Sequence, residues 1–234
     1  ELEPFFDYAE KVFGTSGQAW TVNGQRVGEG KGGNPYAPDR SDHFPLVSQK
    51  NTYSAQLFQK AANEVGYKPY NLPSANTSGP YTNPYGAQMG PCNFCGFCSG
   101  YVCYMYSKAS PNVNILPALK PLPNFELRPN AHVIRVNLDS TKTKATGVTY
   151  IDALGREIEQ QADLVILGAF QFHNVRLMLL SGIGKPYDPK TGEGVVGKNF
   201  AYQNMGTIKA YFDKDVHTNN FIGAGGNGVA IDDF

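Results

Sequence analysis

The sequence predicts an α+β fold, and two observations on hydrophobic periodicity lead to this prediction. Apolar side chains recur at helical spacing within residues 1–13, 48–67 and 172–182. Between residues 125 and 169 the apolar period changes to two, which is typical of β-strands. Composition adds a third observation. The chain holds 26 glycines and 16 prolines, so we expect long irregular loops between these elements.

The first two helical stretches lie in the N-terminal part of the chain. The apolar residues of the first are Leu2, Phe5, Phe6, Ala9 and Phe13. A polar, Gly/Pro-rich loop over residues 24–41 follows. The second helix ends at Gly66, since glycine commonly stops a helix. We expect its inward face to carry Leu57, Phe58, Ala61, Ala62 and Val65. Residues 67–91 are almost wholly turn-forming, and so long a loop is more often functional or cofactor-supported than idle.

Five later segments have the alternating or continuous apolar character of strands. They are FELRP (125–129), HVIRVNL (132–138), GVTYIDA (147–153), REIEQQ (156–161) and DLVILGA (163–169). ALGR at 153–156 predicts a hairpin turn. DLVILGA is apolar almost throughout and reaches Gly168, so we expect a strand buried on both faces. This strand, the glycine and the following helix resemble half of a nucleotide-binding α/β unit.

Charge and hydropathy argue against several function classes. The 20 basic and 20 acidic residues balance without long runs, so we expect no nucleic-acid partner and no polybasic membrane patch. No apolar run approaches the ~18 residues of a spanning helix, so no direct membrane span is expected. GAGGNG at 223–228 matches a dinucleotide-binding pattern, but too few residues follow it to open a helix, and we interpret it as a flexible glycine loop.

The strongest functional signal is a group of four cysteines, the only ones in the chain. The pattern is C-x2-C-x2-C-x4-C and comprises Cys92, Cys95, Cys98 and Cys103. Closely repeated thiols can aim several thiolates into one small volume, and a glycine-rich turn supplies N–H groups for cluster sulfurs. The early spacings match bacterial ferredoxins, but Tyr104 replaces their proline after the fourth cysteine. We therefore predict cluster-type ligation without the ferredoxin fold.

Three other uses of these cysteines stay open. Disulfide bonds are plausible in an exported protein, and four is an even number. A zinc knuckle usually pairs two C-x2-C elements separated by ~12–20 residues, and three close cysteines suit a closed tetrahedron less well. A thioredoxin-type C-x-x-C would follow a strand, whereas these cysteines follow a long loop. The spacing favours an iron–sulfur cluster, and four thiols limit the chain to one.

Several stretches together resemble the glucose–methanol–choline (GMC) family of flavin-dependent oxidoreductases. KASPNVNILPALKPLPNFELRPNAHVIRVNLD (108–139) is similar to the family segment that returns into the flavin domain. Residues 145–184 resemble the family's hairpin, buried strand and helix ending in Ser-Gly-Ile-Gly, and GVVGKNFAYQN (194–204) resembles the element that follows. The cysteine block narrows the resemblance to the large flavoprotein subunits of membrane-associated gluconate, fructose, sorbitol and glucose dehydrogenases.

The resemblance implies two cofactors, FAD and an iron–sulfur cluster, with a three-iron cluster favoured over a four-iron one. The metal-ligand candidates are Cys92, Cys95, Cys98 and Cys103. Of these, Cys92, Cys98 and Cys103 match the family's ligand spacing most nearly, and Cys95 could substitute for a neighbour.

For FAD, the resemblance implies three contact residues. Val133 would present its backbone to the adenine. Gly168 and Ala169 would approach the cofactor where a larger side chain would collide.

The same resemblance implies a division of the chain. Residues 1–123 would be a loop-rich, helical portion on the substrate side, residues 124–200 the returning part of the FAD-binding domain, and residues 201–234 the start of the substrate-binding domain. The family's N-terminal G-x-G-x-x-G unit and its C-terminal histidine pair have no counterpart here. The chain therefore resembles an interior fragment of a two-domain enzyme, with a mixed sheet and a hairpin from the FAD domain and no catalytic residue of its own.

By resemblance, the parent enzyme would oxidise a CH–OH group of a sugar, a polyol or a sugar acid. Electrons would pass from flavin through the cluster to a cytochrome c subunit, with a small subunit completing the complex. The resemblance implies a periplasmic location and membrane association through these partners, and a fragment that is inactive alone. The alternative from another class is a non-catalytic carbohydrate-binding module stapled by disulfides.

Overall fold

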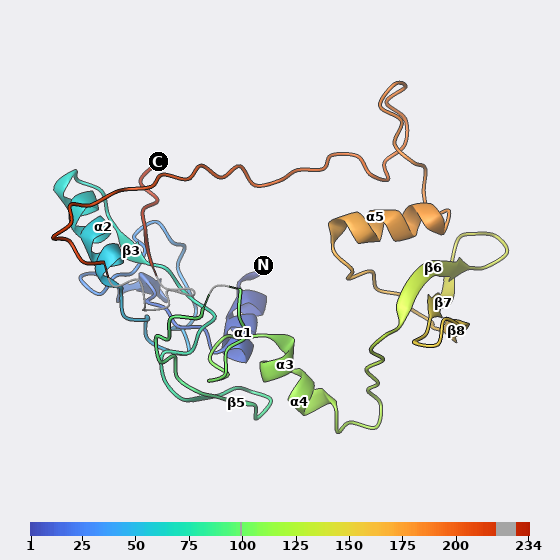
Figure 1. The fold of residues 1–234 in the computed structure, drawn as a ribbon, viewed down its shortest axis with the longest axis horizontal. Coiled ribbons are helices and arrows are strands. Elements are labelled where there is room, and N and C mark those ends of the chain that lie inside the picture. Colours follow the sequence, from blue (N-terminus) through green and yellow to red (C-terminus); the bar gives the residue numbers. More distant parts are fainter. Residues whose placement is uncertain (99, 219–227) are drawn as a thin grey trace. The chain divides into compact units, whose positions relative to one another are not determined.

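The structure is a computed structural model that describes residues 1–98, 100–218 and 228–234 (Figure 1). It divides into two units, one formed by Glu1–Glu126 with Tyr211–Phe234 and the other by Leu127–Ala210. Helices and small antiparallel sheets both occur, so the predicted α+β class is confirmed. The assignment of segments to flavin and substrate domains stays a prediction. Most of GAGGNG, and part of the predicted 201–234 segment, lie outside the described residues.

The first unit has short elements joined by long loops. They are α1 (Glu3–Phe13), β1 (Thr21–Val22), β2 (Gln25–Arg26), α2 (Tyr53–Glu64), β3 (Tyr70–Asn71), β4 (Tyr81–Thr82), β5 (Gln88–Met89), α3 (Pro111–Asn114), α4 (Leu116–Leu119) and β9 (Val229–Ala230). The strands form the antiparallel pairs β1–β2, β3–β9 and β4–β5. The β3–β9 pair attaches the described C-terminal residues to this unit.

Both predicted N-terminal helices are confirmed, and each has a local reason for its ends. Helix α1 has a proline in its first turn and ends at Gly14, whose φ of 64° is left-handed. Helix α2 begins after Thr52, whose hydroxyl accepts a hydrogen bond from the backbone N–H of Ala55. The predicted inward face of α2 is only partly right. Ala62 is buried, but Phe58 and Val65 are 45% and 69% exposed.

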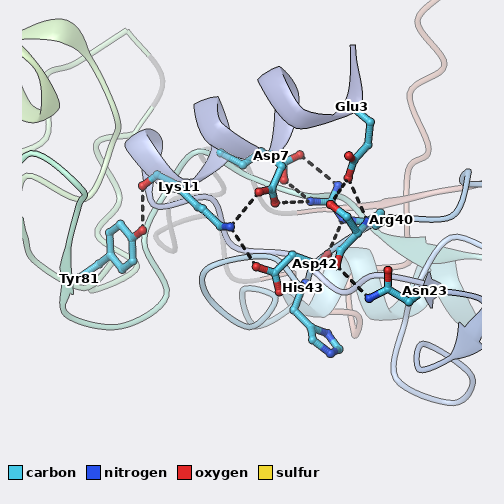
Figure 2. A network of polar contacts seen from close by, with 10 residues as sticks. Glu3, Asp7, Lys11, Asn23, Arg40, Asp42, His43 and Tyr81 are labelled. Atoms are coloured by element: carbon cyan, nitrogen blue, oxygen red, sulfur yellow. Dashed lines mark hydrogen bonds and ion pairs between the residues drawn. The ribbon is translucent and has the colours of Figure 1, made fainter. Parts of the chain in front are cut away.

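Helix α1 contacts the first unit chiefly through its charged side chains, and Val12 is its buried apolar residue. Arg40 forms two hydrogen bonds to the Glu10 carboxylate and lies 3.9 Å from Asp7 (Figure 2). Lys11 pairs with Asp7 at 2.8 Å and with Asp42 at 3.0 Å. The hydrogen bonds to Asp7 and Asp42 raise the pKa of Lys11, and the hydrogen bond from Lys11 lowers the pKa of Asp42. The predicted apolar residues Leu2, Phe5 and Phe6 are exposed.

The centre of the first unit is polar, and residues 74–77 run through it. On one side, the backbones of Ser16 and Ser74 exchange two hydrogen bonds of 2.8 Å. The Ser16 hydroxyl also donates to the carbonyl of Asn76 at 2.7 Å. Ser16 and Thr77 are both fully buried. Buried backbone groups must find partners, and here small hydroxyl side chains supply them in place of long strands.

The second unit is a three-stranded antiparallel sheet with one helix. It comprises β6 (His132–Leu138), β7 (Ala145–Ile151), β8 (Glu157–Gln161) and α5 (Gln171–Leu180). The strands lie in the order β6-β7-β8, and the predicted hairpin turn closes where the backbone of Asp152 donates to Arg156. Val136 of β6 and Leu177 of α5 form its apolar core, being 4% and 6% exposed.

The turn after α5 fastens the helix to the sheet. The Ser181 hydroxyl accepts from the N–H of Val136 at 2.8 Å and donates to the carbonyl of Leu177 at 2.6 Å. Gly184 has a φ of 72°, and a Cβ there would lie 2.8 Å from Val196, so only glycine suits this turn. The Ser-Gly-Ile-Gly and Val-Gly-Lys-Asn segments, distant in sequence, thus meet in space.

Two predicted strands are wrong for this structure. FELRP (125–129) is irregular, and so is DLVILGA (163–169). Leu164 and Ile166 are 76% and 82% exposed instead of buried. A strand exists only through hydrogen bonds to a neighbour, and no named strand of the described residues pairs with either segment. Named strands of the described residues pair only antiparallel, so the predicted mixed sheet is not found there.

Membrane insertion of a helix finds no support in the described part of the chain. None of its helices combines the length and the hydropathy that crossing a bilayer requires.

Candidate functional site

The cysteine loop, residues 92–103, belongs to the first unit and is anchored at both ends on one segment. At its start, the N–H of Cys92 donates to the carbonyl of Thr77 at 2.8 Å. After its end, the carbonyl of Ser107 accepts from the N–H of Thr77 at 3.1 Å, and the N–H of Ala109 donates to Ala75 at 2.8 Å. Residues 75–77 therefore hold the two ends of the loop together.

The buried hydroxyl groups of Thr77 and Ser107 add further hydrogen bonds between the ends of the loop. The Thr77 hydroxyl donates to the carbonyl of Gly90 at 2.5 Å and lies 3.1 Å from Ser107 Oγ. The Ser107 hydroxyl donates to the carbonyl of Thr77 at 3.1 Å. Both side chains are fully buried. Sequence reasoning missed these two residues, because a lone threonine or serine in a turn-rich stretch carries no spacing signal.

All four cysteines are free thiols in the structure, so the disulfide alternative is not realised in it. Cys98 is buried and the other three are half-buried. Burial raises the pKa of the Cys92 thiol against the effect of the Phe94 N–H, and the thiols of Cys98, Cys103 and Cys95 raise it further. The other three thiols therefore act on the protonation of Cys92, and their role as metal ligands stays a prediction.

The pKa of the Cys103 thiol is shifted in the opposite direction, downward. Its burial acts to raise the thiol pKa, but the backbone N–H groups of Lys108, Ser107 and Met105 outweigh burial, and the Lys108 charge adds to them. The net effect is a lowered pKa, which favours the thiolate, the form that binds metal. At the other end of the loop, the N–H of Phe94 points to Cys92 Sγ at 3.5 Å. N–H groups directed at sulfur are the surroundings that cluster thiolates require.

The arrangement of possible metal ligands bears on the zinc alternative. In the described part of the chain, no three side chains of His, Cys, Asp or Glu converge closely enough to hold one metal ion. A tetrahedral zinc site needs such convergence. In a three-iron or four-iron cluster, by contrast, each cysteine binds its own iron, so the thiolates stay apart. Four free thiols in one loop, with N–H groups aimed at two of them, fit the cluster as a donor set.

We expect Thr77→Val to loosen the cysteine loop, while Thr77→Ser keeps it. Valine preserves the shape but removes the hydroxyl, which leaves the buried carbonyl of Gly90 and the hydroxyl of Ser107 short of a partner. Such a loss costs about 1–3 kcal/mol. Hydrogen exchange of the peptide covering residues 88–109 should become faster in Thr77→Val only. Equal exchange in both variants would show that the hydroxyl does not hold the loop.

The three predicted FAD contacts lie in the second unit. Val133 is half-buried on β6, opposite Tyr150, next to an irregularity in the strand register. Gly168 and Ala169 lie in the turn that leads into α5. The Asn174 side chain braces this turn, because its Oδ1 accepts from the N–H of Ala169 at 2.8 Å and its Nδ2 donates to Leu167 at 3.1 Å. Asn174 is a positioning residue that the sequence pattern did not reveal.

Gly168 has no structural reason within its own surroundings to be glycine. Its φ is not left-handed, and a Cβ added there meets nothing within 4 Å. The next residue but one, Phe170, has a left-handed φ of 68°, so the turn carries strain elsewhere. An open, side-chain-free position before a helix N-terminus fits the close approach of a phosphate-bearing cofactor. The roles of Val133, Gly168 and Ala169 stay predictions.

Comparison with known proteins identifies similar sequences. Residues 45–205 match the family model described as GMC oxidoreductase. The chain is 74% identical over 234 residues to the gluconate 2-dehydrogenase flavoprotein of Pantoea cypripedii, covering 100% of this chain and 38% of that protein. It is 26% identical over 201 residues to the paromamine 6'-oxidase of Streptomyces fradiae, covering 85% of this chain and 32% of that protein. The chain thus spans about two fifths or less of the length of these relatives.

Proposed function

This chain belongs to the GMC oxidoreductase family, and from that premise we propose that it is part of an FAD-dependent dehydrogenase of sugars or sugar acids. The substrate class would be CH–OH donors, with gluconate the first candidate because the 74% identical relative carries that name. We further propose an iron–sulfur cluster that relays electrons from the flavin to a cytochrome.

The observation that supports the relay is the cysteine loop. A dehydrogenase that used flavin alone would not need four free thiols in a single loop with backbone N–H groups directed at two of the sulfurs. Cys92, Cys98 and Cys103 would bind the cluster, and Cys95 would lie beside it as a spare thiol. With three ligands, a three-iron cluster is the proposed form.

In the second unit, the proposed roles concern FAD. The backbone of Val133 would face the adenine, and Gly168 with Ala169 would let the cofactor approach the chain closely. When bound, FAD would accept two electrons from the substrate CH–OH group, and the cluster would pass electrons onward singly. The residues of this chain would hold and orient both groups. The base that takes the substrate proton is not among the residues we assign.

The proposed partners follow from the same family relationship. They are a sugar-acid substrate, a cytochrome c subunit as electron acceptor, and a small subunit in the same complex. We propose a periplasmic location with membrane association through these subunits.

Cofactor analysis of the full-length protein tests this function. The protein is purified without oxygen together with its partner subunits. FAD is measured after acid release, and iron and acid-labile sulfide are measured by colorimetry. The reduction of added cytochrome c is then followed with gluconate as the electron donor. We expect all three signals together. Gluconate oxidation by a protein that contains FAD but no iron would contradict the proposed electron relay. Absence of FAD would contradict the proposed dehydrogenase function.

A further inference from the structure

Lys108 lies at the base of the cysteine loop and its side chain reaches back into it. The ammonium group donates a hydrogen bond to the carbonyl of Cys98 and another to the carbonyl of Tyr101 at 3.1 Å. The residue is half-buried, so these contacts are made in partial shelter from water. One side chain thus holds the backbone carbonyl of the most buried of the four cysteines.

The backbone of Lys108 is itself fixed, which gives the ammonium a defined origin. Lys108 forms an antiparallel bridge with Asn76, and the N–H of the next residue, Ala109, donates to Ala75. The neighbouring Ser107 is fully buried. The lysine therefore extends from the anchored end of the loop toward Cys98 and Tyr101, and its two hydrogen bonds restrict its rotamers.

The charge of Lys108 is isolated in the sequence. From residue 69 to residue 119 the chain contains no other Asp, Glu, Lys, Arg or His. A single positive charge in so long a neutral stretch, bound to the carbonyls of Cys98 and Tyr101, faces no competing carboxylate from its own segment.

We propose that Lys108 is a positioning residue of the iron–sulfur site, which fixes the backbone carbonyls of Cys98 and Tyr101 and raises the reduction potential of the cluster. Two physical effects act together. The ammonium binds two backbone carbonyls of the cysteine loop, and its charge would offset the negative charge that a reduced cluster gains. Net charge and hydrogen bonding near the sulfurs are what set cluster potentials. This inference rests on the proposed function.

The test compares variants of the full-length holoenzyme with its partner subunits. Lys108→Met keeps the length of the side chain without its charge, and Lys108→Arg keeps the charge. Lys120→Met, at an exposed lysine outside the cysteine loop, is the matched control. The reduction potential is measured by a redox titration followed by electron paramagnetic resonance, on samples with equal iron per FAD.

We expect Lys108→Met to shift the equilibrium between oxidised and reduced cluster about tenfold toward the oxidised form, which is ~59 mV for one electron. Lys108→Arg should stay near the wild-type potential, and Lys120→Met should equal it. Unchanged potentials in all variants would overturn the inference. If the Lys108→Met protein binds no iron, the Lys108→Arg protein decides the question. Iron bound by Lys108→Arg supports the inference, and iron absent from both variants overturns the role of charge.

The outcome is separable from that of the proposed function. If the wild-type protein contains no iron and gives no cluster signal, the proposed electron relay itself is contradicted. If the wild-type protein contains a cluster and the variants have the same reduction potential as the wild type, only the proposed role of Lys108 is contradicted.

Discussion

Cys98→Ser in the full-length protein is expected to lose its iron and sulfide while it keeps FAD. Cys98 is the most buried of the four thiols, and its carbonyl is held by Lys108, so its sulfur has little freedom to be replaced by a neighbour. Removing an outer-shell partner of a metal site already costs 10–100-fold in affinity. We therefore expect loss of a direct thiolate to cost at least about 100-fold. The FAD candidates belong to the other unit and are unchanged.

Two assays separate the expected losses. Gluconate-dependent reduction of cytochrome c should fall at least about 100-fold, following the iron content. Reduction of a two-electron dye that takes electrons directly from the flavin should stay near wild type. Iron and sulfide per FAD are measured on the same samples.

Cys95→Ser is the matched control, three residues earlier in the same loop. We expect it to keep iron, sulfide and cytochrome c reduction, because the three-ligand assignment leaves Cys95 unused. If Cys95→Ser loses as much iron as Cys98→Ser, the cluster uses four thiolates and the three-iron assignment is wrong. Full iron content in Cys98→Ser would remove Cys98 from the ligand set.

Arg40→Met is expected to release helix α1 from the first unit. The guanidinium is 16% exposed and pairs with Glu10 and Asp7, which are 22% and 14% exposed (Figure 2). Methionine preserves the stem but leaves two carboxylates in a partly buried site without their shared cation. Breaking a fully buried pair costs about 3–5 kcal/mol, so for this partly exposed group we expect about 2–3 kcal/mol.

Hydrogen exchange of the α1 peptide measures this effect locally. A loss of about 2 kcal/mol corresponds to roughly 30-fold faster exchange where α1 opens independently. Arg26→Met is the control, since Arg26 and its partner Glu29 are 62% and 70% exposed. An exposed pair contributes about 0–1 kcal/mol. Equal exchange rates in the two variants would show that the Arg40 network does not hold α1.

Elements with a local signal could be predicted from the sequence. The periodicity of residues 1–13, 48–67 and 172–182 gave helices that the structure confirms, because a helix makes its hydrogen bonds within one segment. The strands at 132–138, 147–153 and 156–161 are also found, with ends shifted by up to two residues. Their hairpin needs only neighbours in sequence. DLVILGA could not be judged in this way, because its pairing depends on a strand from elsewhere.

In the candidate site, too, the features with a local sequence signal could be predicted and the others could not. The spacing of the cysteines indicated a shared function, and the structure does place their thiols in one loop as free groups. The residues that hold this loop, Thr77, Ser107 and Lys108, had no pattern to reveal them. Thr77 meets Ser107 across thirty residues of chain, and only pairing of these segments shows what each hydroxyl does.

By itself, then, the sequence determined the helices, the antiparallel hairpin, the four thiols and the resemblance that family matching confirms. Only the tertiary structure decided which polar side chains are buried, that α1 contacts the first unit chiefly through its charged side chains, and that one lysine reaches into the cysteine loop. The physical reason is range. Periodicity and spacing report interactions within a segment, whereas burial and charge pairing depend on segments that the chain brings together only when it folds.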